Sequence, residues 1–207
     1  MNEAPLRHAA QVARMITLIA PTPLAFIYGQ TQLQPYLEHA FRSNQGYFGH
    51  ARHRLLEEDG QCVGMVASFS AREKFQHDVA LLGSILRFYP GLSGVGVIRR
   101  LMRSVAHHPR PRRATMLLYN LAVAPQARGR GLGSQLLREV IASARATGHR
   151  RVELDVDCEN GSAIEFYRAH GFKVTARMPG ACHAGFRFSD HFRMTLSGAS
   201  MANACGR

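Results

Sequence analysis

Residues 121–133 read Leu-Ala-Val-Ala-Pro-Gln-Ala-Arg-Gly-Arg-Gly-Leu-Gly, a glycine-rich turn placed between an apolar segment and an amphipathic one. Glycines at 129, 131 and 133 let backbone amides converge without interference from Cβ atoms. The helix that follows would add unsatisfied N–H groups and a partial positive charge at its first turn. Arg128 and Arg130 place fixed positive charge beside these donors. The stretch therefore predicts a site for a phosphate or a diphosphate.

Two familiar phosphate-binding loops do not fit this spacing. A P-loop needs a lysine followed by serine or threonine after its last glycine, whereas residues 132–134 are Leu-Gly-Ser. A dinucleotide fingerprint needs the pattern G-x-G-x-x-G, but these glycines alternate with single residues. Taken alone, the turn is also compatible with a tight connection that binds nothing.

The residues around the turn predict alternating strands and helices. Thr115–Val123 is an apolar strand ended by Pro125, and the helix after the turn is expected to end at Gly148. Residues 151–157 alternate as a strand, with Glu153, Asp155 and Asp157 on one face. Ser162 and Glu165 have capping-box spacing for a helix that ends at Gly171. Further strands are expected over 172–176 and 192–196, which gives a mixed α/β sheet.

The first half of the chain predicts helices and one hairpin. Helical spacing covers residues 6–19, 32–41, 71–87 and 95–106, and Tyr89-Pro90-Gly91 separates the last two. Residues 53–57 and 62–69 are expected to form a β-hairpin, because Asp59-Gly60 accepts the positive φ of a tight turn. Residues 198–207 are expected to form a flexible tail.

The net charge of +12 comes from 26 basic residues, 24 of which are arginine. Between Arg99 and Arg151 there are twelve arginines and one carboxylate, Glu139. Such a surface attracts anions such as polyphosphates or nucleic acids, although an arginine-rich composition with solvated faces gives the same count. Tyr119 is the single Phe, Tyr or Trp in this segment, so the aromatic stacking expected of a single-strand binder is missing. Nucleic acid is therefore the less favoured partner.

Cysteine spacing and hydropathy argue against several other classes. The cysteines Cys62, Cys158, Cys182 and Cys205 have no CxxC spacing, so reduced thiols and no metal site are expected. No apolar run approaches the roughly 18–20 residues of a membrane span. The apolar residues 15–20 are too short, and lack the cleavage site, for a secretory signal. The expectation is a cytoplasmic protein that does not enter a membrane.

At this point the sequence resembles the GNAT superfamily of N-acetyltransferases. Their signature of Arg or Gln, two residues, Gly, one residue, then Gly or Ala is met by Arg128, Gly131 and Gly133. A second family feature follows at Asn160, Ala163, Phe166-Tyr167 and Gly171-Phe172. The resemblance covers about residues 115–173 and extends to 52–70.

The resemblance implies a fold and a division of labour along the chain. The implied fold is a mixed, mostly antiparallel central sheet with splayed central strands, flanked by helices. Residues 1–197 would form a single acyltransferase domain. Within it, residues 115–173 would bind acyl-CoA and residues 20–110 would face the acceptor. The sequence departs from the usual start of the family, because no clear strand precedes the helix 6–19.

The resemblance also implies direct attack of an amine on the thioester of acetyl-CoA, the co-substrate. The amides of Gly129, Arg130, Gly131, Gly133 and Ser134, with Arg128 beside them, would hold the pyrophosphate. Leu121 and Val123 would pair with the pantetheine arm, and the Val123 N–H would face the thioester oxygen. Asn160 would hydrogen-bond the arm.

Tyr167 is the candidate general acid implied for the departing thiolate. A thiol has a pKa near ~8.5 and a tyrosine near ~10, so protonation is feasible if the hydroxyl reaches the sulfur. The alternative is an aromatic ring that packs the helix on the sheet. No general base is identified: the carboxylates Glu153, Asp155 and Asp157 are more typical of a solvated or structurally bonded face.

The leading hypothesis is an N-acetyltransferase that acts on a primary amine of a small molecule, a peptide or a protein. A basic nucleic-acid or ribosome-associated protein, and a CoA-binding sensor without turnover, are the alternatives. Steep weakening of binding by salt would indicate phosphate-backbone contacts and so separates the first two classes. The sequence does not specify the acceptor, and a homodimer is compatible with it.

Overall fold

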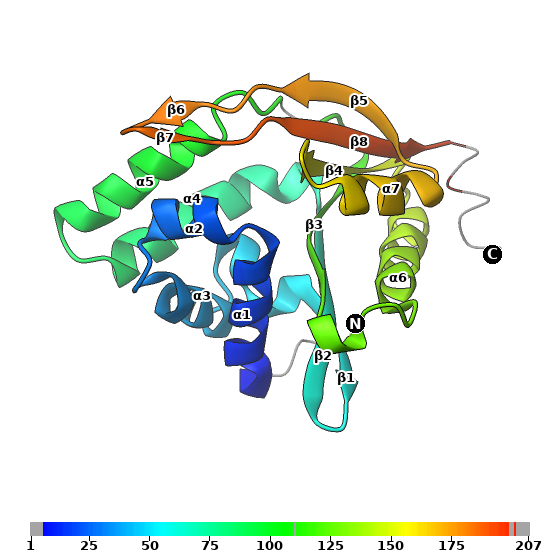
Figure 1. Cartoon of the computed structure of the whole chain (residues 1–207), viewed down its shortest axis with the longest axis horizontal. Helices are drawn as coiled ribbons and strands as arrows, with labels where there is room; N and C mark the ends of the chain where they lie inside the picture. Colours follow the sequence, from blue (N-terminus) through cyan, green and yellow to red (C-terminus); the bar gives the residue numbers. More distant parts are fainter. Residues whose placement is uncertain (1–5, 110, 199–200, 202–207) are drawn as a thin grey trace. The chain divides into compact units, whose positions relative to one another are not determined.

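The computed structural model describes residues 6–109, 111–198 and 201 (Figure 1). Its strands form a six-stranded sheet in the order β1-β2-β3-β4-β8-β5, with a separate two-stranded ribbon of β6 and β7. Three of the recorded pairings in the six-stranded sheet, β1 with β2, β4 with β8 and β5 with β8, are antiparallel, and β3 with β4 is parallel. This confirms the predicted mixed, mostly antiparallel sheet flanked by helices.

The chain clusters into two compact units that interleave along the sequence. Unit 1 comprises Met1–Ala67, Glu73–Met102 and Asn120–Leu136, and unit 2 comprises Ser68–Arg72, Arg103–Tyr119 and Leu137–Arg207. The prediction of a single acyltransferase domain over residues 1–197 stays a prediction.

Unit 1 holds the N-terminal helices and the hairpin. Its α-helices are α1 (Ala9–Ile19), α2 (Pro21–Tyr28), α3 (Leu33–Arg42), α4 (Lys74–Phe88) and most of α5 (Leu92–Ser104). Short 3₁₀ turns lie at Leu6–His8, Gly46–Phe48 and His50–Arg52, and another precedes α4 at Ala71–Glu73. The hairpin pairs β1 (His53–Glu58) with β2 (Gln61–Ser70), and Asp59 and Gly60 take positive φ of 48° and 73° between them. The helices and hairpin predicted from the sequence are confirmed.

The core of unit 1 is formed by apolar faces of its helices. Helix α1 packs on α3, with Val12, Ile16 and Leu37 buried at their facing sides. Tyr28 and Tyr36 stack with ring centroids 4.8 Å apart, which fixes α2 on α3. Helix α2 was not expected from the sequence, because its prolines signal a break. Pro21 instead occupies the first helical turn, where its missing N–H costs nothing.

Unit 2 is built on antiparallel strands around β8. Strand β8 (His191–Ser197) pairs with β4 (Arg151–Asp157) over seven residues and with β5 (Lys173–Met178) on its other side. The remaining elements are α7 (Gly161–Ala169), the strands β6 (Cys182–His183) and β7 (Phe186–Arg187), and most of α6 (Leu132–Ala146). Strand β3 (Thr115–Val123) belongs to unit 2 up to Tyr119 and to unit 1 from Asn120 onward. It pairs with β4 in parallel at Thr115–Leu117, and α6 provides the crossover that parallel strands require.

Two local expectations need correction or lie outside the described residues. The capping box at Ser162 and Glu165 is wrong, because α7 begins at Gly161 and Asn160 is its N-cap. The tail predicted at 198–207 lies outside the described residues except for positions 198 and 201, and so does Cys205.

Among the described residues, no single helix has both the length and the apolar composition to cross a membrane. The segments Leu6–Ile19 and Pro21–Tyr28 meet those two criteria only as a pair, bent by 111° at the break between them.

Candidate functional site

The predicted phosphate turn is an exposed connection between β3 and α6 in unit 1. Strand β3 ends at Val123, and the amide of Ala124 donates to the carbonyl of Val63 at 2.9 Å, which ties the end of the strand to the hairpin. The 3₁₀ turn Pro125–Ala127 follows, with Ala127 buried beneath it. Arg128 to Gly131 are exposed. The turn is not part of a continuous strand and is not buried. A phosphate site requires both of these conditions.

Two glycines of the turn adopt a backbone conformation that other residues rarely take. Gly129 and Gly131 both have φ of +77°, and a Cβ placed on either would meet no atom within 4 Å. Glycine is therefore required here by the dihedral angle and not by crowding. The same open space leaves the backbone on this side accessible to a ligand.

The first turn of α6 supplies amides directed along the helix axis. The amide of Gln135 donates to the carbonyl of Gly131 at 3.0 Å, and this is the first helical hydrogen bond. The amides of Leu132 and Gly133 precede that bond and so have no carbonyl four residues back within the helix. Buried Leu136 and Leu137 anchor the next turn of α6. The arrangement is that of an anion-binding helix N-terminus.

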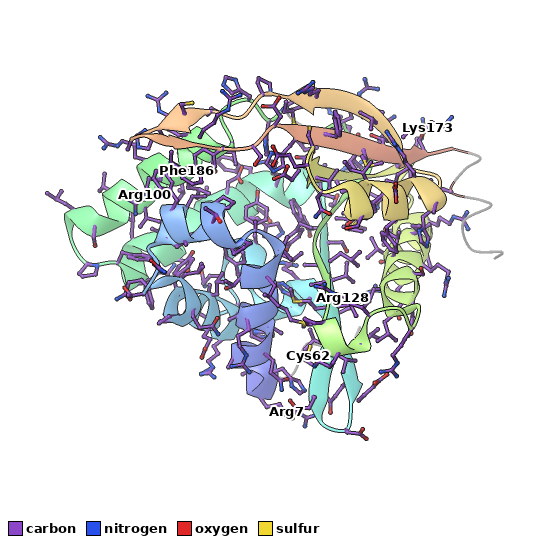
Figure 2. The ribbon with its side chains drawn as sticks, in the orientation of Figure 1. Arg7, Cys62, Arg100, Arg128, Lys173 and Phe186 are labelled. Carbon is purple, nitrogen blue, oxygen red and sulfur yellow. The ribbon has the colours of Figure 1, made fainter. Side chains whose placement is uncertain are left out.

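The two arginines of the turn have different partners. Arg128, labelled in Figure 2, donates from Nε to the carbonyl of Val123 at 3.3 Å. Arg130 donates from Nη1 and Nη2 to the two carboxylate oxygens of Glu58, each at 2.8 Å. The sequence indicated positive charge beside the donors but gave no sign of the Arg130 partner, which lies 72 positions earlier in the chain.

Strand β3 carries a strained residue just before the predicted cofactor-binding edge. Leu121 and Val123 are half-buried, and Asn120 ahead of them has φ of 52°. Asparagine tolerates this left-handed region better than most residues, but within a strand it breaks the side-chain alternation. The side-chain Nδ2 of Asn120 is buried and has no hydrogen-bond partner in the described part of the chain. Sequence reasoning missed this feature, since an asparagine inside an apolar strand carries no distinct signal.

Asn160, in unit 2, is the N-cap of α7. Its Oδ1 accepts hydrogen bonds from the Ala163 amide and the Ser162 hydroxyl, both at 3.1 Å. The cap satisfies one of the orphan amides at the start of the helix. The predicted contact with the pantetheine arm stays a prediction, and it would fall to the Nδ2 group.

Tyr167 lies in the same helix with its ring largely buried. The ring packs between Phe166 and Phe172, at centroid distances of 5.2 and 5.6 Å. Burial raises the pKa of Tyr167 well above its ordinary value, so the hydroxyl remains protonated at neutral pH. The packing role is thus observed, while the predicted role as a general acid is untested.

The acidic face of β4 is structurally bonded. Asp155 receives two hydrogen bonds from Arg193 on β8, at 2.8 and 2.9 Å, and Arg193 also donates to the Pro109 carbonyl at 2.9 Å. Glu153 is 4% exposed, and desolvation raises its pKa while the nearby Arg193 opposes the shift. Of the two interpretations given to this face, structural bonding is the one observed for Asp155.

The predicted site residues fall into two groups. Leu121, Val123, Arg128, Gly129, Arg130, Gly131, Gly133 and Ser134 lie together on β3, the turn and the start of α6 in unit 1. Asn160 and Tyr167 lie at the N-cap and within α7 of unit 2. No cluster of three or more potential metal ligands occurs among the described residues.

Comparison with known proteins gives short sequence matches and a chain-long structural one. An uncharacterized N-acetyltransferase of Methanocaldococcus jannaschii is 45% identical over 56 residues, 27% of this chain and 25% of that protein. An L-methionine sulfoximine/L-methionine sulfone acetyltransferase of Salmonella typhimurium is 34% identical over 78 residues, 38% of this chain and 44% of that protein. These matches span less than half the length of either relative.

The structural likeness covers nearly the whole chain. The crystal structure of an N-acetyltransferase from Staphylococcus aureus aligns with a TM-score of 0.70 and 12% identity, over 94% of this chain and 98% of that one. At that identity the likeness shows the fold alone. The family model described as acetyltransferase (GNAT) family matches residues 14–172, which is more than half of the sequence. The chain therefore belongs to the GNAT family of acetyltransferases.

Proposed function

We propose that this protein is an N-acetyltransferase that transfers the acetyl group of acetyl-CoA to a primary amine, by direct attack within a ternary complex. The observation that carries the proposal is the exposed turn at residues 128–131. Its two glycines with positive φ leave the backbone before the first turn of α6 accessible to a ligand. Family membership supports this assignment over a nucleic-acid-binding role.

The residues of the turn fit the diphosphate of CoA. Amides of the first helical turn and of residues 129–131 supply neutral donors, and the helix dipole favours negative charge there. Arg128 adds a cation whose Nε is held by the Val123 carbonyl, so the rest of its guanidinium is available to a phosphate oxygen. The backbone of Leu121 and Val123 would pair with the pantetheine arm, and the Val123 amide would stabilise the developing oxyanion.

Protonation of the leaving sulfur is assigned to Tyr167. As the amine nitrogen forms a bond to the acyl carbon, the carbon–sulfur bond breaks and the electron pair stays on sulfur. The Tyr167 hydroxyl donates a hydrogen bond to that sulfur and passes it a proton. The amine releases its own proton to water, and the tyrosinate then recovers a proton from water. The raised pKa keeps the donor protonated but makes it a weaker acid. A water or substrate group that donates a hydrogen bond to the Tyr167 oxygen would stabilise the phenolate and lower that pKa.

The acceptor is proposed to be a primary amine on a small molecule or peptide. The Salmonella relative is named for L-methionine sulfoximine and L-methionine sulfone, both amino-acid-like amines. Residues 20–110 are proposed to select the acceptor. We therefore expect amino acids and their analogues to be the first acceptors to test.

The proposal is tested by a screen of amine acceptors with acetyl-CoA, following release of free thiol. Converting Tyr167 to Phe should lower kcat while CoA affinity stays nearly unchanged, because the ring packing is preserved. Calorimetry with CoA supplies the affinity control. A wild-type protein without affinity for any CoA species would overturn the proposal, and an unchanged kcat would remove Tyr167 from it.

A further inference from the structure

The middle of the phosphate turn is attached to the hairpin through one side chain. Arg130 sits between the two left-handed glycines, and its guanidinium forms a two-point bond with Glu58, both distances being 2.8 Å. Glu58 is the last residue of β1 and directly precedes the Asp59-Gly60 turn of the hairpin. Both residues belong to unit 1.

The position of this bond lets it restrict the backbone conformation of the turn. A glycine on each side of Arg130 loses more conformational freedom on ordering than any other residue type. A planar guanidinium bonded at two points fixes direction as well as distance, unlike a single contact. The bond therefore restricts the turn between its two left-handed glycines.

The same bond changes the electrostatic role of Arg130. A guanidinium paired with a carboxylate presents little net charge to a third group, so the pair is a poor phosphate ligand. Arg128, held by a neutral carbonyl, keeps its full charge. Arg128 is therefore the arginine of this turn that we expect to pair with a phosphate, whereas Arg130 is bonded within the protein.

We propose that Glu58 is a positioning residue for the cofactor site. Its bond with Arg130 holds the Gly129–Gly131 turn in the conformation that presents main-chain amides to the diphosphate of acyl-CoA. This inference rests on the proposed function and adds a residue from the hairpin to that site. The competing possibility is that Arg130 leaves Glu58 and binds a phosphate directly.

Charge exchange separates the two possibilities. Calorimetric titrations with CoA would compare wild type, Glu58→Gln, Arg130→Gln and the exchanged pair Glu58→Arg/Arg130→Glu. Each single change is expected to weaken CoA binding by about 2- to 5-fold, the range of a partly exposed ion pair. The exchanged pair restores the bond with the arginine on the hairpin and the glutamate on the turn. It is expected to recover most of the lost CoA affinity. If Arg130 contacted phosphate directly, the exchanged pair would bind more weakly than Arg130→Gln.

The neighbouring Glu57 is the matched control. Its carboxylate accepts hydrogen bonds from Arg7 and His8, which lie outside the turn, so Glu57→Gln is expected to leave CoA affinity unchanged. In steady-state assays Glu58→Gln should raise the KM for acetyl-CoA and leave kcat alone, a split that general loss of fold does not produce. Equal affinity of Glu58→Gln and wild type, or tighter binding by the variant, overturns the inference.

Two further measurements keep the test decisive. If the exchanged pair does not fold, the double variant Glu58→Gln/Arg130→Gln serves instead: losses no larger than those of one single variant support the bond, and additive losses contradict it. Failure of wild type to bind CoA would refute the proposed function itself. Normal wild-type binding with no effect at Glu58 would refute only the positioning role.

Discussion

Two arginine–carboxylate pairs in this molecule share the same two-point geometry and differ in their surroundings. Arg130 and Glu58 bond at 2.8 Å in unit 1 with 53% and 37% of their side chains exposed. Arg193 and Asp155 bond at 2.8 Å in unit 2 with only 10% and 24% exposed. Water weakens the first pair and leaves it adjustable, whereas the second holds β4 to β8 in a poorly solvated place. Two pairs with the same bond geometry therefore have different roles: the exposed pair lies at the candidate ligand site, and the less exposed pair stabilises the sheet.

The largest expected effect is loss of the less exposed pair. Arg193→Met should lower the free energy of unfolding by about 3 kcal/mol, because the buried Glu153 and the partly exposed Asp155 would both lose their arginine partner. Urea denaturation measures this change. The control is Arg177→Gln, which should cost less than about 1 kcal/mol, because the Arg177 side chain that bonds Asp190 is 66% exposed. Equal losses for the two variants would show that burial does not distinguish these pairs.

The next effect concerns the backbone of the turn. Gly131→Ala should destabilise the protein by about 1–2 kcal/mol, since a Cβ is strained at φ of +77° even in open space. The control is Gly96→Ala within α5, where φ is ordinary and the added Cβ would lie 3.5 Å from an Arg100 nitrogen. Alanine there should stabilise by about 0.5–1 kcal/mol. Thermal or urea unfolding compares the two, and a harmless Gly131→Ala would contradict the strained turn.

A smaller effect separates the two roles of Asn160. Asn160→Ala should cost about 1 kcal/mol through loss of the N-cap of α7. Asn160→Asp retains the capping oxygen and so should keep that stability, but it lacks the Nδ2 donor assigned to the pantetheine arm. Unfolding and acetyl-CoA titration of both variants provide the readout. Unchanged affinity in Asn160→Asp would leave Asn160 with the capping role alone.

The smallest effect is a pH dependence from Glu153. Burial raises the pKa of this carboxyl in the folded protein above its unfolded value, so folding takes up a proton between the two values. Its contribution to stability is therefore lost as pH rises from the unfolded pKa through the folded one. The Glu153→Gln variant lacks this titrating carboxyl. Its free energy of unfolding, relative to that of wild type, should therefore increase as pH rises across that window. Parallel pH profiles for the two proteins would contradict the raised pKa.

Local chemistry explains which parts of the site were predictable from sequence. The bounds of β3, the turn and α6 could be predicted, because Pro125 and the glycines of the turn act on the backbone locally in the sequence. The capping residue of α7 was misassigned because Asn160 and Ser162 are both good caps two positions apart, and only packing selects between them. The Arg130 partner and the left-handed Asn120 depend on distant strands, and no sequence pattern marks them.

The central claim is that main-chain donors at residues 128–133 bind a diphosphate, and titration of CoA into the intact protein tests it most directly. Saturable binding at one site per chain is expected in wild type, with affinity reduced at least about 5-fold in Gly131→Ala and unchanged in Gly96→Ala. No detectable binding of CoA to wild type, or equal affinity in all three proteins, would contradict the claim.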